Sequence, residues 1–245
     1  WHDKVSNMKE ISNELNIGLD SMIFLDDDPF NRELMQKVLP QVLTVDLPKD
    51  PALYANSIIN INELNTLKIV KEDLQKGKMY FEQRKRNESK TIFNDLDNYL
   101  KDLKIKIMMK HADEFSMPRI SQLVLKTNQF NLTTKRYQKE ELSKLVKDDN
   151  VIIGCCQVED KFGDNGITNV FIIKTTRSEW IIDLFLSSCR VMGRGIEKSI
   201  LEGIVDDAKK AGIQKIMGKF IPTKRNIVCE NFYEYCGFTK ENNYF

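Results

Sequence analysis

A mostly apolar run from Trp180 to Leu186 is followed by a glycine-rich turn and then by a helical pattern. The run is rich in aromatic and β-branched residues, which predicts a buried β-strand. Apolar residues then recur every three or four positions, which predicts an amphipathic helix. They are Ile196, Ile200, Ile204, Val205 and Ala208. The chain thus predicts a strand, a turn and a helix in direct succession.

The remaining hydrophobic pattern predicts an α/β protein with two different halves. In the first 62 residues, short apolar runs at Met22–Leu25 and Val42–Val45 alternate with helical patterns at Lys9–Leu15 and Asn31–Val38. Such alternation is typical of a parallel sheet. Residues 63–104 form a charged helical connector, with apolar positions that include Leu67, Ile69 and Val70.

The second half, residues 105–245, reads as strands interleaved with helices and predicts a mixed, twisted sheet. The strands are expected at Ile105–Met109, Val151–Val158, Ile167–Ile173 and Ile213–Phe220, and the helices at Met117–Thr127 and Lys139–Leu145. Glu159–Gly166 is predicted as the turn of a hairpin. Asn128–Leu132 is a polar–aromatic stretch between the two helices.

The turn after the central strand carries the pattern R-x-x-G-x-G from Arg190 to Gly195. A strand that turns through glycines into a helix leaves backbone N–H groups unpaired at the positive end of the helix dipole. Such groups bind phosphate or pyrophosphate, and Arg190 and Arg194 can add charge. The alternative is an ordinary structural turn with two glycines.

A second motif follows downstream, with Asn226 and then N-F-Y-x-x-x-G-F from Asn231 to Phe238. Together with the glycine turn it resembles the GNAT (Gcn5-related N-acetyltransferase) fold over residues 105–245. The resemblance implies that the turn holds the pyrophosphate of coenzyme A and that pantetheine lies between two diverging strands. The implied cofactor-binding residues are Arg190, Met192, Gly193, Arg194, Gly195 and Asn226.

Two side chains of this half are candidates for catalysis. Cys189 stands beside Arg190 at a helix start, where a thiol pKa falls and a thiolate nucleophile is favoured. Its alternative is a small packed residue. Tyr233 resembles the tyrosine that many GNAT enzymes use as general acid toward the leaving thiolate. Its alternative is an aromatic clamp in the core.

An acidic sequence, Asp26-Asp27-Asp28-Pro29, follows the first short strand. Carboxylates at the carboxyl end of a parallel strand lie where α/β sheets bind ligands, and they suit Mg²⁺. Asp26 and Asp27 are the candidate ligands. The alternative is an acidic loop in which Asp28 caps the next helix and Pro29 opens it.

Several longer motifs resemble the FkbH-like family, which joins a haloacid-dehalogenase-type phosphatase domain to a GNAT-like domain. They are W-x-x-K-x-x-N from Trp1 to Asn7, LNI at Leu15–Ile17, FLDDDPFNR at Phe24–Arg32, LPxDP at Leu47–Pro51, RxxQLxxKTNQFNLTT at Arg119–Thr134, KFGDNG at Lys161–Gly166 and DLFLSSCRVMGRGIE at Asp183–Glu197. The family is associated with glyceryl transfer from 1,3-bisphosphoglycerate to the phosphopantetheine thiol of an acyl carrier protein.

The chain departs from that family in one respect. Phosphatases of this superfamily use an aspartate nucleophile in D-x-D-x-[TV], and that motif is absent from this sequence. Lys4 resembles the lysine that pairs with phosphate and nucleophile, and Mg²⁺ is implied for the full-length protein. The first 62 residues are therefore expected to be the C-terminal part of the phosphatase domain and to lack phosphatase activity.

Composition and charge narrow the remaining choices. A net charge of +1 gives no support for nucleic acid as a partner, and no apolar run is long enough for a membrane span. Five cysteines without metal-ligand spacing favour a cytoplasmic protein with reduced thiols. An incomplete first sheet is expected to favour homo-oligomers. Two rival functions stay open: an acyl-CoA-dependent N-acyltransferase acting on an amine or amino sugar, and a non-catalytic carrier-protein docking module.

Overall fold

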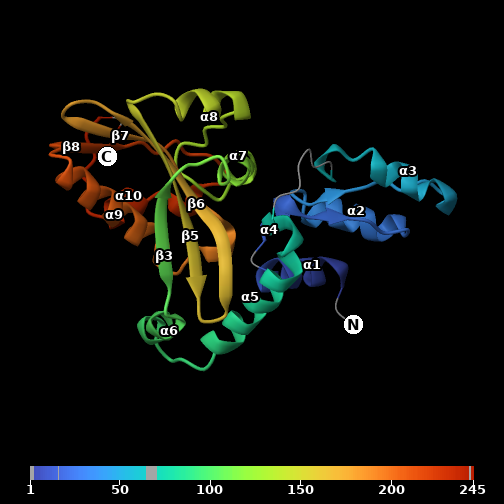
Figure 1. The fold of residues 1–245 in the computed structure, drawn as a ribbon. Coiled ribbons are helices and arrows are strands. Elements are labelled where there is room, and N and C mark those ends of the chain that lie inside the picture. The colour runs from blue at the N-terminus through green and yellow to red at the C-terminus, as the bar shows by residue number, and fades with distance from the viewer. Residues whose placement is uncertain (1–2, 16, 65–70, 243) are drawn as a thin grey trace. The chain divides into compact units, whose positions relative to one another are not determined.

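The computed structural model describes residues 3–15, 17–64, 71–242 and 244–245 (Figure 1). The chain divides into two compact units, Trp1–Asn87 and Glu88–Phe245. The division falls within helix α5 (Lys76–Lys90), inside the segment predicted as a connector. Some positions named above lie outside the described residues, namely Trp1, Asn16, Leu67, Ile69 and Val70.

The first unit is a small α/β arrangement. Its elements are α1 (Lys4–Leu15), β1 (Ile23–Phe24), α2 (Pro29–Val38), β2 (Leu43–Thr44), α3 (Tyr54–Ile59), α4 (Lys71–Leu74) and 3-10 turns at Leu19–Ser21, Pro51–Leu53 and Asn62–Leu64. Strand β1 pairs with β2 in parallel, as predicted. Buried side chains of α1, α2 and both strand regions form its core, among them Met8, Phe24, Met35 and Val42.

Two details of this unit differ from or extend the prediction. Helix α1 begins at Lys4 rather than Lys9, because Asp3 caps it by accepting hydrogen bonds from the backbone N–H (2.8 Å) and the hydroxyl (2.6 Å) of Ser6. Leu25 and Phe30 beside the short sheet are exposed. Association through these apolar side chains stays a prediction.

The second unit contains a six-stranded sheet and the helices that cover it. Its elements are α6 (Leu96–Leu103), β3 (Lys106–His111), α7 (Met117–Lys126), β4 (Phe130–Asn131), α8 (Lys139–Leu145), β5 (Val151–Asp160), β6 (Gly163–Thr175), β7 (Glu179–Ser187), α9 (Ile196–Lys210), β8 (Lys215–Gly218), α10 (Phe232–Tyr235) and 3-10 turns at Cys189–Val191 and Ile227–Cys229. The predicted α/β class is confirmed.

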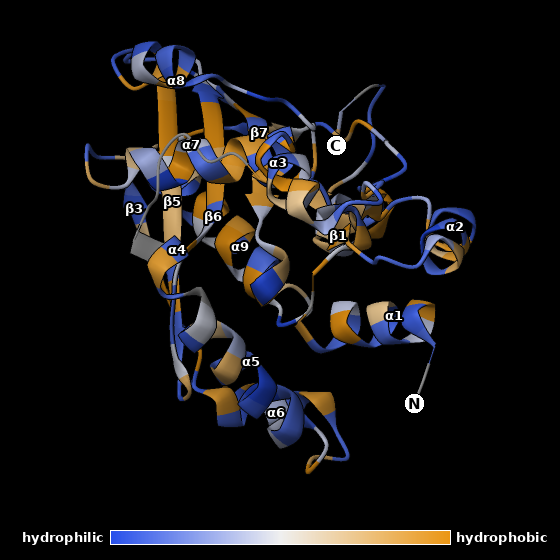
Figure 2. Cartoon of the chain, turned by 90° about the vertical axis from the view of Figure 1, so that its right-hand side faces the viewer, coloured by the Kyte–Doolittle hydropathy of each residue, from blue (hydrophilic) through white to orange (hydrophobic). Residues whose placement is uncertain are grey.

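The sheet has the order β3-β5-β6-β7-β4, and β8 also pairs with β7. The β7–β8 pair is parallel and the others are antiparallel, which confirms a mixed sheet. One core lies on the face covered by α9, and a second lies on the face covered by α7 and α8. Figure 2 shows that β5 and β6 are hydrophobic over much of their length. Burial on both faces explains why these strands read as apolar runs.

The hairpin prediction was wrong in its boundaries. Strands β5 and β6 continue to Asp160 and Gly163, so only Lys161 and Phe162 form the turn. The Asp160 carboxylate accepts hydrogen bonds from the N–H groups of Phe162 (2.9 Å) and Gly163 (3.3 Å), which closes a turn this short. No helix of the described residues is long and apolar enough to cross a membrane.

Candidate functional site

The predicted strand, turn and helix form a continuous unit at the centre of the sheet. Strand β7 ends at Ser187, a 3-10 turn spans Cys189–Val191, and α9 begins at Ile196. Gly193 and Gly195 are exposed and have φ values of +76° and +73°. L-residues rarely adopt that left-handed conformation, so the turn depends on glycine at both positions.

The start of α9 has backbone N–H groups that could bind a ligand. Gly195 is the N-cap residue and makes no side-chain capping hydrogen bond. The first turn of any helix has N–H groups without intrahelical acceptors, and they lie at the positive end of the helix dipole. Because α9 has fifteen residues, this dipole is well developed. The backbone here suits a phosphate group.

The two arginines of the turn have different places. The Arg194 guanidinium is buried, lies 3.2 Å from the Asp160 carboxylate at the end of β5, and donates a 2.6 Å hydrogen bond to the Arg190 carbonyl. Its charge therefore ties β5 to the turn. Arg190 is half-buried, with Nε 3.5 Å from the Ser188 hydroxyl. Of the two, Arg190 is the less buried residue, although its Nη2 atom is enclosed.

Two polar residues beneath the turn were not among the predicted site residues. The Ser187 hydroxyl donates a 2.7 Å hydrogen bond to Glu197, a buried residue in the first turn of α9. Burial raises the pKa of Glu197, although this hydrogen bond acts in the opposite direction. The sequence signal was an acidic residue directly beside the apolar stripe of a predicted helix.

The predicted nucleophile and general acid lie apart from any open cavity described below. Cys189 is half-buried at the first position of the 3-10 turn. Met192 is half-buried and packs against the α9-side core. The roles predicted for both residues, in catalysis and in cofactor binding, stay predictions.

Tyr233 is enclosed by the core. Its ring contacts those of Phe232, Phe238 and Phe245 and packs over Gly218, where a Cβ would come within 2.2 Å of it. The side chain is 1% exposed, and its hydroxyl makes no hydrogen bond with the described residues. Burial raises its pKa far above the usual value. This placement favours the aromatic clamp over the general acid.

Strands β7 and β8 separate beyond their paired residues, and β4 lies against β7 there. Strand β8 pairs with β7 only over Glu179–Ile182. Further along the same edge of β7, β4 takes its place: Phe130 pairs with Ser187, and Leu132 N–H donates to the Phe185 carbonyl at 3.0 Å. The other side of β4 is engaged as well, since the Leu132 carbonyl accepts from Ile221 N–H at 2.8 Å.

Asn226 fixes that inserted strand. It is fully buried, and its Nδ2 donates to the carbonyls of Asn131 (2.8 Å) and Ile221 (3.0 Å). Its Oδ1 accepts from the N–H (2.7 Å) and hydroxyl (2.9 Å) of Thr223. The resemblance placed Asn226 in cofactor binding, whereas the structure places its amide within the protein's own hydrogen bonds.

A buried carboxylate lies at an irregularity in β7. The register between β6 and β7 shifts so that Asp183 is an extra residue on β7. Its carboxylate accepts hydrogen bonds from Lys135 and Tyr137 and lies 3.1 Å from Lys174. Burial opposes ionisation, but these partners lower the pKa of Asp183 overall. Sequence reasoning missed this cluster because its members are distant in the chain.

In the first unit, Lys4 and Asp26 form an ion pair, with 3.4 Å between Nζ and Oδ2. The role that the resemblance implies for Lys4, toward phosphate and nucleophile, stays a prediction. Asp26 also accepts hydrogen bonds from Asp28 N–H (3.0 Å) and Asn31 (3.3 Å). Burial alone would raise its pKa, but these bonds and Lys4 lower it. Asp28 caps α2, as the structural alternative predicted.

The described residues do not by themselves complete a metal site. Asp27 is exposed, and no group of three carboxylate, histidine or cysteine side chains converges within the described parts of the chain. Mg²⁺ is normally bound by several oxygen ligands, so the donor set of Asp26 and Asp27 alone does not fit it. Their role as metal ligands stays a prediction for a longer protein.

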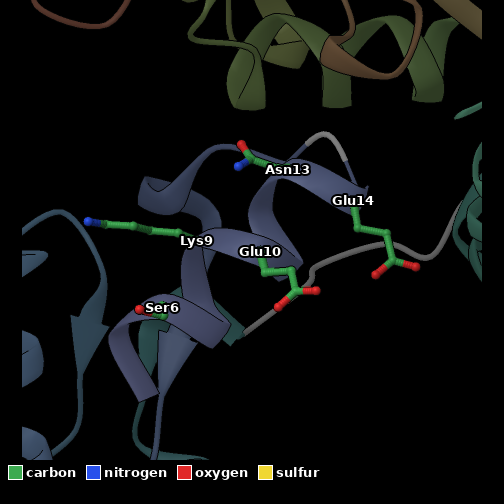
Figure 3. A pocket seen from close by; sticks show the side chains of 5 residues that line it. All are labelled: Ser6, Lys9, Glu10, Asn13 and Glu14. Atoms are coloured by element: carbon green, nitrogen blue, oxygen red, sulfur yellow. The ribbon is translucent and has the colours of Figure 1, made fainter. Parts of the chain in front are cut away.

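Two surface cavities lie elsewhere. One, of about 650 Å³, is lined by polar residues of α1 only, namely Ser6, Lys9, Glu10, Asn13 and Glu14 (Figure 3). The other, of about 570 Å³, lies between the second half of α9, β8 and the C-terminal segment. None of the predicted site residues lines either of them.

Comparisons with known proteins give distant structural similarities. No family model and no curated protein sequence matches the chain. The ribosomal-protein-S18-alanine N-acetyltransferase of Escherichia coli is 11% identical, covering 56% of this chain and 80% of that one, with a TM-score of 0.44. The glucosamine-6-phosphate N-acetyltransferase of Arabidopsis thaliana is 17% identical, covering 56% and 94%, with a TM-score of 0.40.

A third similarity has higher identity but is short. The N-terminal part of the protein BF1531 from Bacteroides fragilis, which contains a phosphatase domain and is complexed with Mg, is 39% identical over 28% of this chain and 18% of that one. Its TM-score is 0.27. Because all three scores are below 0.5, the functional argument depends on the geometry of this chain.

Proposed function

We propose that residues Glu88–Phe245 form a GNAT-like acyltransferase domain that binds a thioester of coenzyme A and transfers its acyl group to an amine. The observation that carries this proposal is the exposed left-handed turn at Gly193 and Gly195. It joins β7, the strand that loses its pairing with β8 after Ile182, to the uncapped start of α9. A phosphate-bearing arm that approached β7 would meet these N–H groups.

Some groups at the turn hold the fold together, and others would bind the ligand. The Arg194–Asp160 ion pair and the Ser187–Glu197 hydrogen bond hold the turn against β5 and β7. The N–H groups from Gly193 to Ile196 would bind phosphate oxygens, with Arg190 as the cationic neighbour. Coenzyme A, when bound, supplies an acyl group activated as a thioester. Cys189, next to Arg190, is the candidate nucleophile if the acyl group passes through the protein.

The same turn suits the single phosphate of a carrier protein's phosphopantetheine. A second candidate is the glyceryl transfer from 1,3-bisphosphoglycerate to an acyl carrier protein, which the resemblance of the first unit to phosphatases suggests. That second candidate depends on sequence resemblance and concerns a longer protein. A domain that only docks a carrier protein would leave transfer intact in Cys189→Ala.

A titration with coenzyme A tests the main proposal. Coenzyme A should raise the unfolding temperature in a saturable way, and pantetheine, which has no phosphate, should not. Gly195→Asp places a carboxylate at the phosphate site and should weaken coenzyme A binding by about 100-fold. Acetyl-CoA and a panel of amines, with thiol release as the readout, then test for turnover.

Gly212→Asp is the matched control, because it places the same side chain in a similar backbone conformation. Gly212 also has a left-handed conformation (φ +75°) with open space around it, but it lies after the other end of α9. Its substitution should carry a similar backbone strain and leave coenzyme A binding unchanged. If coenzyme A does not bind the folded protein, or binds Gly195→Asp equally well, the proposal is wrong.

A further inference from the structure

We propose that β4 is an autoinhibitory strand that competes with the thioester arm for one edge of β7. This inference rests on the proposed function, because it concerns how an arm whose phosphate lies at the Gly193–Gly195 turn reaches the sheet. The edge of β7 beyond Ile182 is the nearest stretch of strand to that turn, and β4 occupies it through Phe130–Leu132. Both occupants cannot pair with the same backbone groups.

The closed position of β4 is held by contacts on all sides. Phe130 contacts the rings of Phe185 and Phe232, and Leu132 is fully buried. Asn226 donates to the Asn131 carbonyl, and the Thr133 hydroxyl donates to the Asp183 carbonyl at 2.9 Å. Withdrawal of β4 exposes two apolar side chains and breaks these hydrogen bonds, so the open form is a minority.

The strand is nevertheless short, and its exit is strained. Only Phe130 and Asn131 have strand geometry. Thr134, directly after the buried stretch, has a φ of +53°. A β-branched residue is rarely found in this left-handed conformation. The strain is maintained by the hydrogen bond from Thr134 N–H to Asn131 Oδ1 (2.9 Å) and is relieved when β4 leaves. The buried contacts thus hold β4 in place, whereas the backbone strain at Thr134 favours its release.

The consequence is a ligand affinity set by the position of β4. A ligand that binds only the open form has its affinity reduced by the fraction of molecules that are open. Weakening the attachment of β4 should therefore tighten coenzyme A binding, although every such substitution destabilises the folded domain. That inverse relation separates competition from direct contact, since loss of a side chain that touches the arm would weaken binding.

The test compares coenzyme A binding by calorimetry in the wild-type chain, Asn226→Ala and Thr133→Val. Loss of a buried hydrogen bond to β4 should tighten binding by roughly tenfold. Thr133→Val is the milder change and serves if Asn226→Ala does not fold. Ser116→Ala is the control, because Ser116 is buried and its side chain bonds Asp113 and Cys155, away from β4.

Hydrogen exchange gives a second readout in the wild-type chain. Saturating coenzyme A should speed exchange at Leu132, whose N–H is bonded to Phe185 in the closed form, while it protects residues 193–196. Equal or weaker binding by the variants, or unchanged exchange at Leu132 in the bound state, overturns the competition but leaves the proposed function standing. Absence of binding in all four proteins overturns both.

Discussion

The two units each contain a strand, a turn and a helix in succession, and they treat the start of the helix in opposite ways. In the first unit, β1 leads to α2, and Asp28 caps the helix by accepting from Phe30 N–H at 2.9 Å. In the second, β7 leads to α9, and Gly195 caps the helix without a side chain. The first helix start has a carboxylate at the N-cap itself, whereas the second has a bare N-cap and carries its carboxylate, Glu197, buried in the first turn.

This difference shows that anion binding does not follow from a strand–turn–helix element alone. An aspartate at the N-cap satisfies the N–H groups and repels phosphate. A glycine in the left-handed conformation leaves the N–H groups available and allows close approach. The cap residue, read together with the φ value that it must adopt, is therefore the informative position in such elements.

The largest expected effect tests whether Arg194 belongs to the framework of the glycine turn. Arg194→Met should lower the free energy of unfolding of the second unit by about 3–5 kcal/mol, because it leaves the buried Asp160 carboxylate without this ion pair. Urea unfolding followed by Trp180 fluorescence, in a Trp1→Phe background, reports this unit, since Trp180 is buried on β7.

The control for this prediction removes both charges. Arg194→Met combined with Asp160→Asn should recover most of the lost stability, because no buried charge is then left without its partner. Loss of less than about 1 kcal/mol in the single variant, a value typical of surface ion pairs, would contradict the framework role and return Arg194 to the candidate phosphate ligands.

The second prediction removes the carboxylate cap from the first unit. Asp28→Ala should destabilise the start of α2 by about 1 kcal/mol, because Phe30 N–H loses its acceptor. Amide exchange in α2 should become about fivefold faster, while exchange in α9 serves as the internal control. A change that spreads equally to α9 would show that the effect is not a local loss of capping.

Much of the fold could be predicted because its signals are local. The apolar stripe that starts at Ile196 predicted the start of α9, and α8 has the predicted bounds, Lys139–Leu145. Strand β4 could not be found in this way. Asn131 and Thr133 are buried polar residues in and just after the strand, and the backbone carbonyl of Asn131 and the hydroxyl of Thr133 bond Asn226 and the Asp183 carbonyl, which lie far along the chain. The sequence showed only a polar–aromatic stretch at Asn128–Leu132, and hydrogen bonds to distant residues make part of it a strand.

The candidate site also contains features that local sequence predicts and features that depend on distant residues. The glycines of the turn were predictable, because their conformation is a property of two residues and their neighbours. The partner of Arg194 was not predictable, since Asp160 lies 34 positions earlier in the chain. Tyr233 shows the limit of motifs: its spacing matched a catalytic tyrosine, but packing over Gly218 buries its hydroxyl. A sequence motif indicates where a residue lies along a helix or strand, but tertiary packing decides which groups its side chain contacts.

The smallest expected effect comes from pH, and it should differ in sign between the two turns. Burial raises the pKa of Glu197 above 4.5, so its contribution to the second unit is present at low pH and is lost as pH rises through the folded-state pKa. Asp26 has a pKa below 3.8, so its contribution to the first unit is present above that pH and is lost on acidification.

Glu197→Gln resembles the protonated acid and keeps an oxygen to accept from Ser187. Unfolding of the second unit between pH 4 and pH 7 should therefore become less pH-dependent in this variant, with the gain over wild type growing toward pH 7. A gain that is largest at pH 4 would mean that Glu197 is stabilised as the anion, as an acid near the start of a helix often is.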